Sequence, residues 1–252
     1  MSLFDRKKRA SAEKWNIRTM FGPNMDFATT EAYKLLRTNI IFSFPEEATG
    51  RVIGITSSIQ NEGKSSTACN TAYALAESGA KVILVEADLR RPTLSSKLGL
   101  ARTPGLTNLL VSKGDYRELI QHCDISPAMD VITSGDIPPN PSELLSASRT
   151  EQLLEELKQN YDYIIVDLPP VTVVSDALAI SKYLDGVLLV VRSGVSDRQM
   201  LAEALRQLNM VDVQILGFLY QDSEENKKKY ARKYSKKYYK YYQEYTKKPS
   251  KR

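Results

Sequence analysis

The chain has 252 residues, a net charge of +5 and 42% hydrophobic residues, enough for one domain with a sizeable core and somewhat short for two. No apolar stretch approaches the ~20 residues that cross a bilayer, and Met1–Arg9 lacks the apolar core of a signal peptide. We therefore expect a cytoplasmic protein. Cys69 and Cys123 lack zinc-site spacing and are predicted to be inert thiols. His122 is predicted to lie in a loop and not to act as a catalytic base.

The net charge conceals an asymmetry along the chain. Twelve basic residues and one acidic residue give residues 226–252 a charge of +11, so the remaining 23 basic and 29 acidic residues give −6. A basic tail on an acidic body indicates contact with something anionic.

In chain order, residues 1–27 are polar and predict a flexible basic lead. A helix is expected from Thr29 or Thr30 to about Phe44. Beyond it we expect strands at residues 51–56, 81–86, 129–133, 161–167, 186–192 and 213–220, and helices at residues 65–78, 150–159, 176–183 and 198–209. This alternation predicts an α/β fold, with a mostly parallel sheet and helices on both faces. Ligands of such sheets bind beyond the carboxyl ends of the strands.

The strongest motif is Ser58-Ile-Gln-Asn-Glu-Gly-Lys-Ser65, between an expected strand and an expected helix. It fits the P-loop pattern GxxxxGK[ST], except that Ser58 replaces the first glycine. In a P-loop, backbone N–H groups wrap the phosphates, Lys64 would pair with the outer phosphates, and Ser65 would offer a hydroxyl to Mg²⁺. The predicted nucleotide-binding residues here are Ser58, Gln60, Asn61, Glu62, Gly63, Lys64, Ser65 and Ser66.

Carboxylates end two of the other expected strands. Glu86 and Asp88 leave the strand at residues 81–86, and Asp167 ends the strand at residues 161–167 in a Walker B pattern. Because such an Asp holds Mg²⁺ through its water shell, these residues predict a magnesium site beside the P-loop.

The tail carries seven of the fourteen tyrosines, crowded among lysines: Tyr230, Tyr234, Tyr238, Tyr239, Tyr241, Tyr242 and Tyr245. With almost no aliphatic residues, residues 223–252 cannot bury a core, and we expect them to be disordered or loosely helical. Their composition alone fits a phosphoacceptor tail, a nucleic-acid arm or a segment for an anionic membrane.

Together these motifs resemble the bacterial tyrosine kinases of capsule and exopolysaccharide systems (BY-kinases), of the Firmicutes type with a separate membrane adaptor. The resemblance covers about residue 28 to the C-terminus. Walker A corresponds to residues 58–65, Walker A′ to residues 82–92 and Walker B to residues 164–169. The proline-rich segment at residues 134–145 and the segment at residues 190–194 also fit, and Glu31, Lys34 and Arg37 match the motif ExxRxxR.

The resemblance implies a P-loop kinase domain at residues 28–222 that uses ATP and Mg²⁺ to phosphorylate the tail tyrosines in trans within a ring-type homo-oligomer. It implies catalytic roles for Lys64, Glu86, Asp88 and Asp167, and Mg²⁺ binding by Ser65, Asp88 and Asp167. Arg192 and Gln221 would line the nucleotide, and Glu31, Lys34 and Arg37 would make the oligomer contact. The implied partners are a transmembrane, polysaccharide-copolymerase-like adaptor that activates and recruits the kinase to the membrane, and a cognate tyrosine phosphatase. No specific nucleic acid is expected.

Four positions depart from the family pattern. Glu86 replaces an Asp that would act as base toward the tyrosine hydroxyl, and its carboxylate reaches about one methylene further. Lys34 replaces an Arg and loses bidentate pairing. Asn61 replaces a Gly, although Asn tolerates left-handed backbone angles. Gln221 replaces an Asn near the adenine.

Two other functions compete. A ParA/MinD-like switch ATPase shares the fold, but its signature lysine would stand at Ile59. A weakly active scaffold for the membrane adaptor is the second alternative, because Glu86 leaves the catalytic geometry open.

Overall fold

The structure is a computed structural model that describes residues 25, 27–45, 50–112, 114–122, 126 and 128–221. Outside these residues lie Cys123, the tail with its seven tyrosines and the predicted basic lead except for residues 25 and 27. None of the helices in the described ranges is both long enough and apolar enough to cross a membrane.

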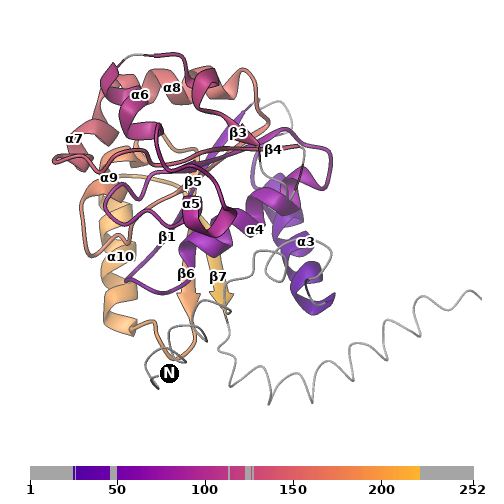
Figure 1. Cartoon of the computed structure of the whole chain (residues 1–252). Helices are drawn as coiled ribbons and strands as arrows, with labels where there is room; N and C mark the ends of the chain where they lie inside the picture. Colours follow the sequence, from indigo (N-terminus) through magenta and orange to yellow (C-terminus); the bar gives the residue numbers. More distant parts are fainter. Residues whose placement is uncertain are drawn as a thin grey trace, which may run out of the picture.

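A seven-stranded sheet forms the centre of the fold (Figure 1), with the strand order β3-β4-β2-β5-β1-β6-β7. The strands are β1 (Arg51–Ser57), β2 (Val82–Glu86), β3 (Gln121–His122), β4 (Met129–Ile132), β5 (Tyr163–Asp167), β6 (Gly186–Arg192) and β7 (Ile215–Gln221). All neighbouring pairs are parallel except β3 and β4. The predicted α/β class is therefore confirmed.

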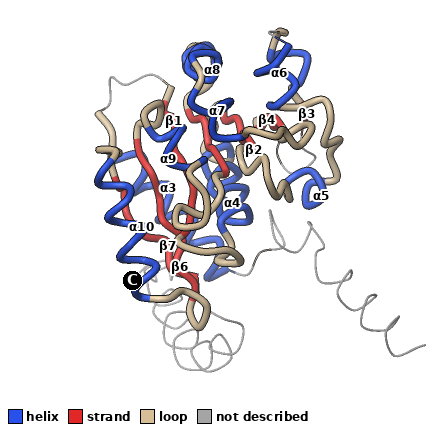
Figure 2. The backbone as a smooth tube through the Cα atoms, turned by 90° about the vertical axis from the view of Figure 1, so that its left-hand side faces the viewer, coloured by secondary structure: helices blue, strands red, loops and turns tan. Residues whose placement is uncertain are grey.

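Helices cover both faces of the sheet (Figure 2). Their bounds are α3 (Phe27–Phe42), α4 (Lys64–Ala76), α5 (Leu94–Leu98), α6 (Leu106–Ser112), α7 (Pro141–Ser146), α8 (Ser148–Lys158), α9 (Asp176–Ser181) and α10 (Arg198–Met210), with a 3-10 turn at Tyr116–Leu119. Helices α3, α4 and α5 share one buried apolar cluster, while α6 to α10 share a second. Successive residues of a strand point to opposite faces, so Ile164 joins one cluster and Ile165 the other.

The helices and strands predicted between residues 29 and 220 are present with small shifts at their ends; for example, the helix predicted over residues 65–78 is α4 and ends at Ala76. Four short helical segments, α5, α6, α7 and the 3-10 turn, were not predicted, because seven or fewer residues show too little periodicity. The prediction that His122 lies in a loop was wrong. It belongs to strand β3, where its Nδ1 lies 2.8 Å from Asp130 Oδ1.

The order of the central strands brings the motifs together. Strand β5 lies between β2 and β1, with Asp167 in register with Glu86 on one side and Ile55 on the other. The P-loop leaves the carboxyl end of β1 and enters α4. Motifs far apart in sequence thus meet at one edge of the sheet.

The packing between the layers gives a first prediction. Ile165 in β5 is fully buried, so we expect Ile165→Ala to lower the free energy of unfolding by roughly 2–5 kcal/mol in urea titrations. Val111→Ala, at a side chain that is 66% exposed on α6, is the control and should change it by less than ~0.5 kcal/mol. Equal effects of the two substitutions would contradict this description of the core.

Candidate nucleotide-binding site

The P-loop holds two residues in the left-handed region, Asn61 with φ 66° and Gly63 with φ 93°. The left-handed backbone predicted to be tolerable at Asn61 is confirmed. At Gly63 a side chain would also collide with the amide of Gln221. The loop conformation therefore depends on a glycine at position 63.

Glu62 stabilises that shape from inside the loop. It is fully buried; its carboxylate accepts hydrogen bonds from Ser58 Oγ (3.0 and 3.1 Å) and from the backbone N–H of Ile59 (2.8 Å). The hydroxyl of Ser196, before α10, also donates to Glu62. These bonds give a physical reason for a serine at position 58, where the P-loop pattern has glycine. They also leave the main chain of Glu62, and not its carboxylate, for a phosphate.

Lys64 lies among the carboxylates at the strand ends. Its Nζ is 2.7 Å from Asp88 Oδ2, 3.8 Å from Asp167 Oδ1 and 3.4 Å from Ser65 Oγ. Burial opposes the charged amine, but Asp167 and Asp88 together raise the pKa of Lys64. Lys64 therefore stays protonated and ready to meet phosphate oxygens.

Asp167 is fully buried, and neither carboxylate oxygen has a hydrogen-bond partner within the described ranges. Burial raises its pKa to about 6, against the opposing effect of Lys64. Two buried oxygens that accept no hydrogen bond within the described ranges, one of them in a long ion pair with Lys64, fit a hard cation that keeps most of its waters. Mg²⁺ is commonly bound through one or two carboxylates together with nucleotide phosphates, and Asp88 and Asp167 are the carboxylates that could serve here.

Glu86 differs from its two neighbouring carboxylates. It is fully buried, and its Oε1 accepts hydrogen bonds from the N–H groups of Thr93 and Leu94, both at 2.6 Å. Its Oε2 accepts one from the N–H of Ser134 at 3.1 Å. Both oxygens thus accept backbone N–H groups, but Oε2, with a single such bond, keeps a lone pair that could accept a proton. The expected proton transfer from a tyrosine to Glu86 stays a prediction.

The remaining predicted nucleotide-site residues lie around the loop. Gln60 accepts a hydrogen bond from Arg91 Nη1 at 2.7 Å, and Arg192 Nη1 donates to the carbonyl of Asn61 at 3.0 Å. Gln221 closes the far side, donating to Thr67 Oγ1 at 2.5 Å.

Two side chains at this site are not among the residues predicted from the sequence. Lys97 of α5 donates to Ser66 Oγ at 3.3 Å. Asp176 is fully buried and accepts two bonds from Arg90 (2.7 and 3.0 Å) and one from Ser142 (2.6 Å). This Asp176 clamp ties the Walker A′ loop to α7 and α9. No local motif marks either residue, because their partners are distant in sequence.

The three predicted oligomer-contact residues lie on α3, away from the P-loop. Lys34 Nζ pairs with Glu31 Oε1 at 2.8 Å. Arg37 Nη1 donates to the carbonyl of Ala74 in α4 at 3.0 Å. Arg37 therefore already links α3 to the helix that begins at the P-loop.

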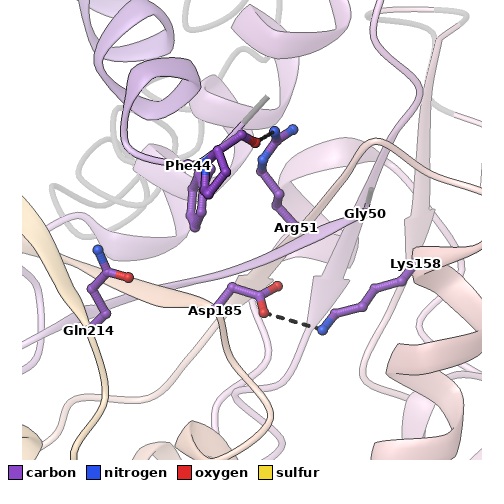
Figure 3. A pocket seen from close by; sticks show the side chains of 7 residues that line it. Phe44, Gly50, Arg51, Lys158, Asp185 and Gln214 are labelled. Atoms are coloured by element: carbon purple, nitrogen blue, oxygen red, sulfur yellow. Dashed lines mark hydrogen bonds and ion pairs between the residues drawn. The ribbon is translucent and has the colours of Figure 1, made fainter. Parts of the chain in front are cut away.

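A pocket of about 310 Å³ lies at the opposite, amino-terminal ends of the strands. Figure 3 shows its lining, with the ion pair between Lys158 and Asp185 at 3.3 Å. Arg51 of this pocket donates to the carbonyl of Pro45 at 2.8 Å. The pocket shares no residue with the P-loop, and its positive groups are largely engaged, so the carboxyl-end site is the one suited to a nucleotide.

The loop between β1 and α4 carries a partly buried lysine, and two aspartates lie at the carboxyl ends of neighbouring parallel strands. These features define a P-loop nucleotide-binding protein with Walker A, A′ and B motifs. Comparisons with known proteins agree. Residues 50–214 match the family described as AAA domain. Cobyrinic acid a,c-diamide synthase from Mycobacterium smegmatis, solved with a bound ATP analog and magnesium, shares the fold at 20% identity (TM-score 0.60, covering 68% of this chain and 74% of that chain).

More specific matches are tyrosine kinases. Tyrosine-protein kinase YwqD of Bacillus subtilis (strain 168) is 37% identical over 222 residues, 88% of this chain and 92% of that protein. Tyrosine-protein kinase CpsD of Streptococcus agalactiae serotype III (strain NEM316) is 34% identical, covering 80% and 86%. The solved kinase domain of Escherichia coli tyrosine kinase ETK aligns with a TM-score of 0.73 at 34% identity, covering 77% of this chain and 75% of that one. The chain belongs to this family of bacterial tyrosine kinases.

The buried carboxylate of Asp167 gives a second prediction. Because its pKa is raised on folding, the folded state binds more protons than the unfolded state between about pH 4 and pH 6, and stability falls as the pH rises through that window. Removing the charge with Asp167→Asn should therefore stabilise the ligand-free protein at pH 7 by roughly 1–3 kcal/mol.

The check is thermal unfolding in EDTA and in Mg-ATP. The Asn variant should melt higher than wild type in EDTA, yet gain less from Mg-ATP. Asp212→Asn, at an exposed turn residue, should behave like wild type in both. A lower melting temperature for Asp167→Asn in EDTA would contradict the cost assigned to this buried charge.

Proposed function

We propose that the protein is an ATP- and Mg²⁺-dependent protein-tyrosine kinase that phosphorylates its own C-terminal tyrosines in trans, within a ring-type oligomer, and so regulates capsule or exopolysaccharide synthesis. The observation that supports this most directly is Lys64 held 2.7 Å from Asp88 and 3.8 Å from Asp167 beside an ordered P-loop. Kinase names among relatives that match most of the chain support the reaction type.

In this proposal the P-loop amides and Lys64 bind the phosphates, while Ser65, Asp88 and Asp167 would hold Mg²⁺. The metal would neutralise charge on the transferred phosphoryl group. Lys64 would exchange its contacts with the two aspartates for contacts with the phosphates. Phosphoryl transfer depends mainly on positioning and charge neutralisation, so a base at Glu86 would aid the reaction without being its main requirement.

The proposal includes a division of the chain and a set of partners. Residues 28–222 form the kinase domain, residues 1–27 a basic lead and residues 223–252 the acceptor tail. A transmembrane adaptor recruits the cytoplasmic kinase to the inner face of the membrane and activates it, and a tyrosine phosphatase reverses the reaction. Glu31, Lys34 and Arg37 on α3 contribute to the contact between subunits.

A switch ATPase is the competing function. The septum site-determining protein MinD from Pyrococcus horikoshii shares the fold at 23% identity with a TM-score of 0.57, which concerns the fold alone. Ile59 stands where the signature lysine of that class is expected. This residue favours the kinase over a sandwich-dimer ATPase.

The third prediction tests the activity by intact mass and tyrosine-site mapping before and after incubation with Mg-ATP. We expect phosphate increments on residues between 230 and 245 in wild type. Lys64→Met should lose at least ~100-fold of the rate, because the phosphates lose their main side-chain cation. Lys182→Met, at an exposed lysine, is the matched control and should phosphorylate like wild type. Consumption of ATP without tyrosine modification would favour the switch ATPase.

A fourth prediction concerns the charge of the tail. Each phosphotyrosine adds a charge of about −1.5 to −2, so roughly six or seven of them would cancel the +11 of residues 226–252. We expect phosphorylation to weaken attraction to the acidic body of a neighbouring subunit and to open the oligomer. Size-exclusion chromatography at low salt should show later elution of phosphorylated than of dephosphorylated protein; identical volumes would rule the charge switch out.

A further inference from the structure

Helix α5 has a fixed place beside the P-loop. Glu86 Oε1 accepts hydrogen bonds from the N–H groups of Thr93 and Leu94 at 2.6 Å each, at the start of the helix. On the apolar side, Leu94 and Leu98 are buried in the cluster shared with α3 and α4. The helix is thus held by polar and apolar contacts at once.

From this position α5 presents Lys97 to the first turn of α4. Lys97 Nζ donates to Ser66 Oγ at 3.3 Å, and Ser66 directly follows the P-loop residues Lys64 and Ser65. Burial lowers the pKa of Lys97, while the nearby carboxylate of Asp167 acts in the opposite direction. Lys97 is therefore an amine among the buried charges of the site, although no sequence motif includes it.

The charge balance of the site suggests a function for Lys97. Glu86, Asp88 and Asp167 bring three carboxylates to the strand ends, and Lys64 alone cannot balance them. A nucleotide polyphosphate would add further negative charge. A second cation offsets this repulsion where water is excluded, and charge-assisted hydrogen bonds to phosphate are among the stronger polar contacts.

We propose that Lys97 is a second phosphate-binding cation for the nucleotide, and that Glu86 is the positioning residue that fixes α5 so that Lys97 reaches the phosphates. The inference rests on the proposed nucleotide-dependent function. It gives Glu86 a positioning role that uses the hydrogen bonds seen in the structure, in addition to the proposed aid as a base.

The first test measures the Kd of Mg-ATP by calorimetry for wild type, Lys97→Met, Lys97→Arg and the exposed control Lys182→Met. We expect Lys97→Met to bind about 10- to 100-fold more weakly, Lys97→Arg to recover part of the loss, and the control to match wild type. Unfolding without nucleotide, measured for all four, separates a loss of affinity from a loss of folded protein. If Lys97→Met binds Mg-ATP with wild-type affinity, the proposal is overturned, whether or not tyrosines are phosphorylated. If the Kd values follow the expected pattern but no tyrosine is modified, only the kinase function is rejected.

The second test asks whether Glu86 acts through Lys97. Glu86→Asp draws the carboxylate back by one methylene and should lose the bonds to Thr93 and Leu94. We expect Glu86→Asp to weaken the binding of Mg-ATP several-fold in the wild-type background and hardly at all in the Lys97→Met background, because coupled residues give non-additive effects. An equal effect in both backgrounds, or faster tyrosine phosphorylation with an unchanged Kd, would overturn the positioning role.

Discussion

One constraint governs the site: the protein must stabilise buried carboxylates at the ends of its parallel strands, where burial disfavours their negative charge. Lys64 offsets part of this cost through Asp88 and Asp167. Glu86 is satisfied by backbone N–H groups, whereas Asp167 has no hydrogen-bond partner in the described part of the chain and carries a raised pKa. The negative charge of each carboxylate is thus stabilised in a different way. Asp167, which accepts no hydrogen bond in the described part of the chain, is the one best suited to a metal.

The surrounding loops keep these charges in place. Glu62 holds the P-loop from inside and connects it to Ser196. The Asp176 clamp joins the Walker A′ loop to α7 and α9 through Arg90 and Ser142. Because the carboxylates of Glu62 and Asp176 are buried and bonded to several segments, removing one partner would leave a buried carboxylate with fewer hydrogen bonds. The geometry of the site is therefore a property of the whole carboxyl edge of the sheet.

Much of this could be predicted from the sequence, because long apolar strands and the P-loop pattern are local signals. The positions of Lys64, Asp88 and Asp167 followed from parallel strands ending at one edge. The partners of Glu86 and Asp176 could not be predicted: Ser134 is 48 residues from Glu86, and Arg90 is 86 residues from Asp176. Lys97 escaped prediction because five-residue α5 has no clear period, and β3 because two residues show no alternation.

The contact of Gln221 with the P-loop has a consequence for biosynthesis. Gln221 is the last residue of β7; its amide lies against Gly63 and donates to Thr67. A ribosome releases the amino-terminal part of a domain first, so Walker A, A′ and B all emerge before the strand that closes the loop. A nascent chain would therefore complete its nucleotide site only after β7, the last strand of the sheet, has emerged.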